Sequence, residues 1–81
     1  MNLREKIFAH LKKLNFAENY LWTPPQYLNA FLIELNPVEK KNFSQTMQEL
    51  CDENFFISEG DSQLPSYRLT KKLKNYFINN S

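Results

Sequence analysis

The dipeptide Asn36-Pro37 constrains this chain more than any other feature, because it ends one helix and begins the next. Asparagine is a preferred helix cap, and proline at the first helical position sacrifices no intrahelical hydrogen bond. Glu39, three positions after the cap, is placed to reach back to the cap's own amide. We therefore expect two helices, about Pro24–Leu35 and Pro37–Glu53, to meet at a tight turn.

The same cap pattern marks two further helix starts. Asn2-x-x-Glu5 predicts a helix over about Leu3–Leu14, and Thr23-x-x-Gln26 begins the helix at Pro24. His10 lies on the apolar face of the first helix, where a histidine without a second site residue is interpreted as packed at the core edge. Spacings of three and four predict the buried positions Leu3, Ile7, Leu11 and Leu14, then Leu28, Phe31, Leu32 and Leu35, then Phe43, Met47, Leu50 and Cys51.

The period changes after the third helix. Phe55-Phe56-Ile57-Ser58 indicates a strand, and Ser66-Tyr67-Arg68-Leu69-Thr70 alternates as a half-buried return strand does. The segment between them, Glu59–Ser66, is polar apart from Leu64 and contains the turn-forming residues Gly60 and Pro65. These features predict an antiparallel hairpin.

A closing helix is expected after Thr70, with Leu73, Tyr76 and Phe77 facing inward. The short aromatic segment Tyr20-Leu21-Trp22, just before the second helix, has two interpretations. It forms a brief first strand that joins the hairpin, or Trp22 packs on Tyr27 across the Thr23 cap.

The chain has 81 residues, which is enough for one domain (1–81) with a single small core. Met1 is not followed by the apolar run of a signal peptide, and no segment is long and apolar enough to span a membrane. We therefore predict a cytoplasmic protein with no membrane partner. Cys51 is the only cysteine, which excludes an intrachain disulfide and favours a small packed hydrophobe over a reactive thiol.

Catalysis is not predicted. With one His, one Cys and one Gly, the chain offers no Ser-His-Asp arrangement, metal-ligand cluster or glycine-rich phosphate loop. We expect no enzyme activity, no metal site and no cofactor.

The expected order of elements resembles the winged helix-turn-helix family over nearly the whole chain. The local similarity lies in Met47-x-x-Leu50-x-x-x-x-Phe55-Phe56-Ile57, followed by Tyr67-Arg68-Leu69-Thr70 and a helix. Winged-helix regulators often have glycine at the position of Asn54, and asparagine is the residue that best replaces it at a left-handed helix end. They also have a glycine shortly after the Leu-Thr pair, where this chain has Leu73. The resemblance implies an α+β winged-helix fold and a transcriptional regulator that binds double-stranded DNA through its third helix.

The third helix carries side chains that suit base recognition. Gln and Asn pair with adenine, and Lys reaches guanine or phosphate. Glu49, Asp52 and Glu53 lie towards the far end of this helix, away from the expected duplex. The candidate DNA-binding residues of this helix are Lys40, Lys41, Asn42, Ser44, Gln45 and Gln48, with Lys41, Gln45 and Gln48 placed at base edges and Lys40 at phosphate. Arg68, Lys71 and Lys72 complete the candidate set.

Charge argues against a strong grip on DNA. The net charge is only +1, and the turn Ser58–Gln63 contains two acids and no base. Carboxylates near phosphates are repelled. The alternative function is therefore a winged-helix module that binds a protein partner through the third helix or through an apolar surface near the last helix. Ile78 on that last helix also suggests a homodimer contact.

Overall fold

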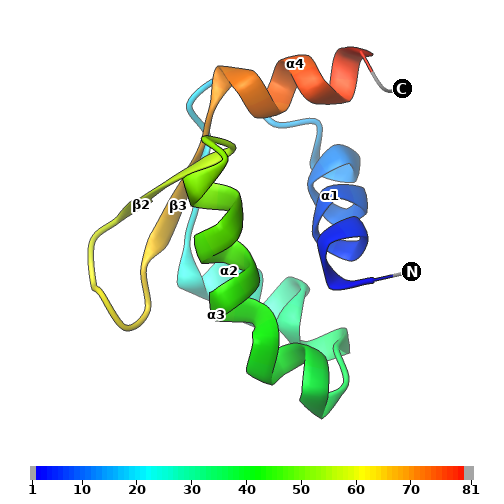
Figure 1. Cartoon of the computed structure of the whole chain (residues 1–81), viewed down its shortest axis with the longest axis vertical. Coiled ribbons are helices and arrows are strands. Elements are labelled where there is room, and N and C mark those ends of the chain that lie inside the picture. The colour runs from blue at the N-terminus through cyan, green and yellow to red at the C-terminus, as the bar shows by residue number, and fades with distance from the viewer. Residues whose placement is uncertain (1, 80–81) are drawn as a thin grey trace.

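The computed structural model describes residues 2–79, which form an α+β arrangement (Figure 1). Within this range there are four α-helices, one turn of 3-10 helix and a three-stranded antiparallel sheet, which confirms the predicted fold class at this level. The elements in order are α1 (Leu3–Leu14), β1 (Leu21–Trp22), α2 (Pro24–Ala30), η1 (Leu32–Glu34), α3 (Pro37–Asp52), β2 (Phe56–Glu59), β3 (Ser66–Leu69) and α4 (Lys71–Asn79).

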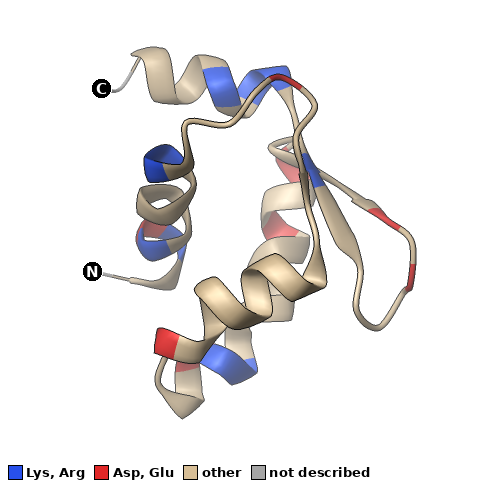
Figure 2. Ribbon diagram, turned by 180° about the vertical axis from the view of Figure 1, so that it is seen from behind, with Lys and Arg blue, Asp and Glu red and all other residues tan. Residues whose placement is uncertain are grey.

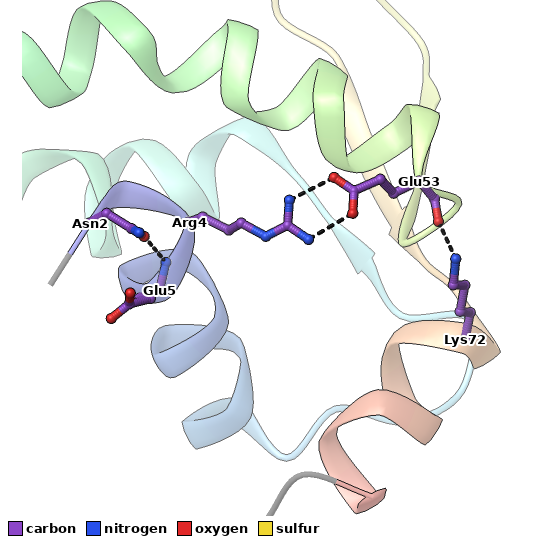
Figure 3. Close-up of polar contacts among 5 residues, drawn as sticks. All are labelled: Asn2, Arg4, Glu5, Glu53 and Lys72. Atoms are coloured by element: carbon purple, nitrogen blue, oxygen red, sulfur yellow. Dashed lines mark hydrogen bonds and ion pairs between the residues drawn. The ribbon is translucent and has the colours of Figure 1, made fainter.

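The three cap patterns begin helices where the sequence places them. The Asn36 side-chain oxygen accepts a hydrogen bond from the Glu39 amide at 2.9 Å, and Glu39 accepts one from the Asn36 amide at 3.2 Å. At α1, the Asn2 side chain accepts from the Glu5 amide at 2.8 Å (Figure 3). These bonds satisfy first-turn amides that have no partner within the helix, so the starts of α1 and α3 are locally encoded.

The second helix is shorter than predicted and ends at Ala30, not at Leu35. Phe31 leaves helical geometry at φ −121°, and the chain tightens into η1 before reaching Asn36. The prediction of Leu28 as a core residue is wrong: it is 38% exposed, and Tyr27 is buried in its place. Tyr27 and Phe31, four residues apart, share the inward face.

The sheet has the strand order β1-β3-β2. Trp22 pairs with Tyr67 across β1 and β3, and Ser58 pairs with Tyr67 across β2 and β3. Both interpretations of the Trp22 segment hold, since β1 is a strand and the Trp22 ring also lies 5.4 Å from the Tyr27 ring. Asn54 has φ 68°, the left-handed conformation expected at the end of α3, and Gly60 takes φ 80° in the hairpin.

A cluster of buried rings joins the sheet to the helices. Trp22 contacts the rings of Tyr27, Phe31 and Phe43 at centroid distances of 5.4–6.2 Å, and only 1% of its surface is exposed. The His10 ring lies 5.8 Å from Trp22 and 5.1 Å from Phe31, which confirms its place at the core edge, and burial lowers the pKa of His10. Five of these rings contact one another, and we call them the aromatic cluster: Trp22, Tyr27, Phe31, Phe43 and Tyr67.

Three further core predictions need correction. Leu14 is 42% exposed in the last turn of α1, where it lines a hollow with Trp22 of β1 and residues of α2. Tyr76 is 40% exposed although its ring contacts Phe8 and Phe55. Cys51 is only partly buried, and burial raises the pKa of its thiol, which disfavours the reactive thiolate.

Replacing Trp22 tests the importance of the aromatic cluster. Trp22→Ala should lower the free energy of unfolding by about 3–5 kcal/mol, because it leaves a cavity where four elements meet. A domain of this size has little more stability than that, so urea unfolding followed by circular dichroism should show a largely unfolded protein. Leu28→Ala is the control and should change stability by less than about 1 kcal/mol. Similar losses in both variants would contradict this account.

Candidate nucleic-acid interface

The outward face of α3 is set by its inward face. Phe43, Met47 and Leu50 are buried at spacings of four and three, so the positions between them turn to solvent. Every candidate DNA-binding residue on this helix is exposed: Lys40, Lys41, Asn42, Ser44, Gln45 and Gln48. Lys41, Gln45 and Gln48 follow one another at spacings of four and three, so they form one stripe along the helix, about 10 Å long. We call this the α3 stripe.

Charge changes along α3. At its beginning, the acid Glu39 is paired with Lys6 of α1, and the hydrogen bond from Lys6 lowers the pKa of Glu39. Lys40 and Lys41 next to it have no ion pair among the described residues. At the other end, the Gln48 amide donates to Asp52 at 3.1 Å. The first half of α3 is therefore basic, and its second half is acidic.

Arg68 is held within the protein. Its Nε donates to Glu59 Oε2 at 2.6 Å, its Nη2 donates to Glu59 Oε1 at 3.0 Å, and its Nη1 donates to the Asn19 carbonyl at 2.9 Å. These bonds fasten the hairpin to the loop before β1 and use most of the guanidinium's donors. Figure 2 shows acidic positions along the hairpin loop, and no Lys or Arg occurs between Ser58 and Tyr67.

Lys72 is also engaged, at the junction of three helices (Figure 3). Its Nζ donates to the Glu53 carbonyl at 2.6 Å and lies 4.9 Å from the centre of the Phe55 ring. The Glu53 carboxylate accepts two hydrogen bonds from Arg4 of α1, at 2.6 and 2.7 Å. The side-chain bond from Arg4 lowers the pKa of Glu53. This contact joins the beginnings of α1 and α4 to the end of α3.

The structure thus divides the predicted residues into two places. Lys40 and the α3 stripe lie between Lys40 and Gln48 in α3, whereas Lys71 and Lys72 begin α4 next to Glu53, at the end of α3. About 20 Å of helix separates Lys40 from Glu53, and about 8 Å separates Gln48 from Glu53. Lys71 is exposed and has no ion pair among residues 2–79. The carboxylates that hold Arg4, Lys6 and Arg68 were not anticipated from the sequence, because two of the three pairs join distant segments.

Among residues 2–79, no three His, Cys, Asp or Glu side chains are grouped so as to hold a metal ion. No helix in the same range has the length and apolar character needed to cross a membrane.

Comparison of the chain with protein-family models, with curated proteins and with solved structures finds no match.

The Arg68–Glu59 pair makes a prediction about pH. Hydrogen bonds from Arg68, and the charge of its guanidinium, lower the pKa of Glu59 below its ordinary value of 4.5. The stability from this pair is therefore fully present above that value and is lost as the pH falls through the lowered pKa. In Arg68→Gln, NMR titration should return the pKa of Glu59 to its ordinary value. Glu53 is the internal control, because Arg4 still lowers its pKa. An unchanged pKa of Glu59 would contradict the assignment.

Proposed function

We propose that this protein is a winged-helix protein that binds double-stranded DNA through α3 and acts as a transcriptional regulator. The element order α1-β1-α2-α3-β2-β3-α4 and the strand order β1-β3-β2 support the winged-helix assignment. In that arrangement α2 and α3 form the helix-turn-helix, and the β2–β3 hairpin forms the wing. A recognition helix reads bases with the residues of its N-terminal half, which here carries Lys40 and Lys41, and Gln45 and Gln48 continue the same face beyond it.

The observation that carries the proposal is the α3 stripe, Lys41, Gln45 and Gln48, exposed next to Lys40. Lys and Gln side chains donate to the base edges that the major groove displays. The pairing of Glu39 with Lys6 reduces negative charge at the end of α3 that would approach the duplex. The proposed phosphate contacts are Lys40 and Lys71, because Arg68 and Lys72 already bond within the protein.

The proposal gives the wing little part in binding. Glu59 neutralises Arg68, and Asp61 accepts hydrogen bonds from the Gln63 and Leu64 amides at 2.7 and 3.4 Å, which leaves a carboxylate at the tip. This charge disfavours contact with phosphate. Affinity should therefore be modest and should depend on α3.

Salt dependence and matched variants test the proposal. Fluorescence anisotropy with a mixed-sequence duplex should show binding at low salt, and two phosphate contacts predict a drop in affinity of about tenfold between about 50 and 200 mM salt. Lys40→Ala should reduce the salt slope by about 1, whereas Gln45→Ala should weaken binding and leave the slope unchanged.

Lys13→Ala is the matched control, because Lys13 is an exposed lysine on α1. It should bind like the unmodified protein. Absence of binding at tens of micromolar protein in low salt would overturn the proposal, as would α3 variants that bind as well as the control.

A second function, binding to a protein partner, is favoured by one observation. Ile33 and Val38 are each 67% exposed on either side of the turn between α2 and α3. Leu28, Leu32, Ile33 and Lys40 line a shallow hollow of about 390 Å³ beside that turn. Exposed apolar side chains that gather near one site mark protein contacts more often than DNA contacts. Such binding would change little with salt, whereas the proposed DNA binding weakens as salt rises.

A further inference from the structure

One stripe of α1 lies at the surface beside α4, and within it only the Phe8 ring packs inward, on Phe55, Tyr76 and Phe77. Glu5, Phe8, Ala9 and Lys12 follow one another at helical spacing and all line one hollow of about 220 Å³, together with Tyr76 and Phe77 of α4. We call these four residues the α1 stripe. Figures 1 and 2 both place α1 at the edge of the molecule opposite the β2–β3 hairpin.

The α1 stripe has opposite charges at its two ends. Glu5 and Lys12 are both exposed, and neither has an ion pair among residues 2–79. Between them lie the apolar Phe8 and the small Ala9. Beyond Lys12 a second hollow, of about 360 Å³, is lined by Phe16, Phe77 and Ile78 and by a second lysine, Lys74. The face is therefore acidic at one end, apolar in the middle and basic at the other end.

We propose that the α1 stripe is the centre of a homodimer interface, in which α1 of one protomer packs antiparallel against α1 of a second copy. A twofold axis between positions 8 and 9 places Glu5 of each protomer opposite Lys12 of the partner subunit. Seven residues of helix separate Glu5 from Lys12, about 10 Å, so both ion pairs form at once. Isologous contacts require this self-complementarity, in which residue i meets j and j meets i.

The surroundings of the axis suit a second copy better than an unrelated partner. Ala9, next to the axis, lets two helices approach closely. Phe8 and Phe77 supply partly buried apolar surface on its flanks, and Ile78 is 63% exposed. A stable interface covers about 800 Å² of each partner, roughly 15% of this protein's 5289 Å² surface. A charge pattern that reverses about its own midpoint matches a copy of itself.

The dimer is independent of the proposed DNA binding. The α1 stripe lies away from the hairpin, and none of its four residues belongs to the candidate DNA-binding set (Figure 1). Failure of one proposal therefore leaves the other standing.

Charge reversal tests the interface directly. In sedimentation equilibrium, Glu5→Lys and Lys12→Glu should each weaken the dimer by at least about tenfold, because each puts two like-charged pairs across the axis. The double variant E5K/K12E restores both pairs with their signs exchanged, so its dimer should recover to within a few-fold of the unmodified protein. Glu49→Lys and Lys41→Glu are matched controls on α3 and should leave the dimer unchanged.

Both reversals also oppose the helix dipole of α1, so circular dichroism must show that each variant is folded. An oxidation experiment avoids this problem. In a Cys51→Ser background, Ala9→Cys should form an intermolecular disulfide rapidly, because facing positions of close-packed helices bring Cα atoms within disulfide range. Ser44→Cys on α3, in the same background, should cross-link much more slowly.

Three results would overturn the proposal. The first is an unmodified protein that stays monomeric at hundreds of micromolar, which would leave this face to a different partner. The second is a dimer that the single charge reversals weaken no more than the α3 controls do. The third is Ala9→Cys that cross-links no faster than Ser44→Cys.

Discussion

The packing of Trp22 against α2 and α3 is the interaction on which the rest of the structure depends. The two-residue strand β1 brings this ring beneath both helices, where it contacts Tyr27, Phe31 and Phe43. Its strand partner Tyr67 belongs to β3 and contacts Tyr27 and Phe43 in turn. The helix pair and the hairpin are therefore parts of one core. The Tyr27 hydroxyl strengthens this link by donating a hydrogen bond to the Pro65 carbonyl at 2.8 Å. Tyr67 is buried in the same core, and this burial raises the pKa of its hydroxyl to about 12.

This core determines what α3 presents to solvent. Phe43 belongs to the aromatic cluster, and Met47 and Leu50 continue the same buried face, so α3 cannot rotate without exposing them. Lys41, Gln45 and Gln48 are consequently held outward in one line. The ion pair between Arg4 and Glu53, with Lys72 on the Glu53 carbonyl, fixes the far end of the helix against α1 and α4. The proposed recognition surface thus rests on rigid elements, as a base-reading surface requires.

Local signals in the sequence predicted much of the fold. Asn36 with Pro37 and Glu39, and Asn2 with Glu5, act within one helical turn, so their effect can be read from neighbouring residues. The burial of Tyr27 in place of Leu28 was missed, because both residues fit a helical spacing with Phe31 and only the packing against Trp22 and Tyr67 selects Tyr27.

The polar contacts that alter the candidate site were less accessible from sequence. Arg4 and Glu53 are 49 residues apart, and only the packing of α1 against α3 brings them together. Arg68 was expected near the wing, but its pairing with Glu59 depends on the register of β2 and β3. The sequence therefore predicts which side chains α3 exposes, but it does not predict which basic side chains already make ion pairs or hydrogen bonds within the protein.

NMR spectra of the amides during titration with a short duplex at low salt test the proposed function most directly. The account predicts the largest shifts from Lys40 to Gln48 and at Lys71, with little change from Gly60 to Gln63. Shifts concentrated in the hairpin, or no shifts at all, would contradict it.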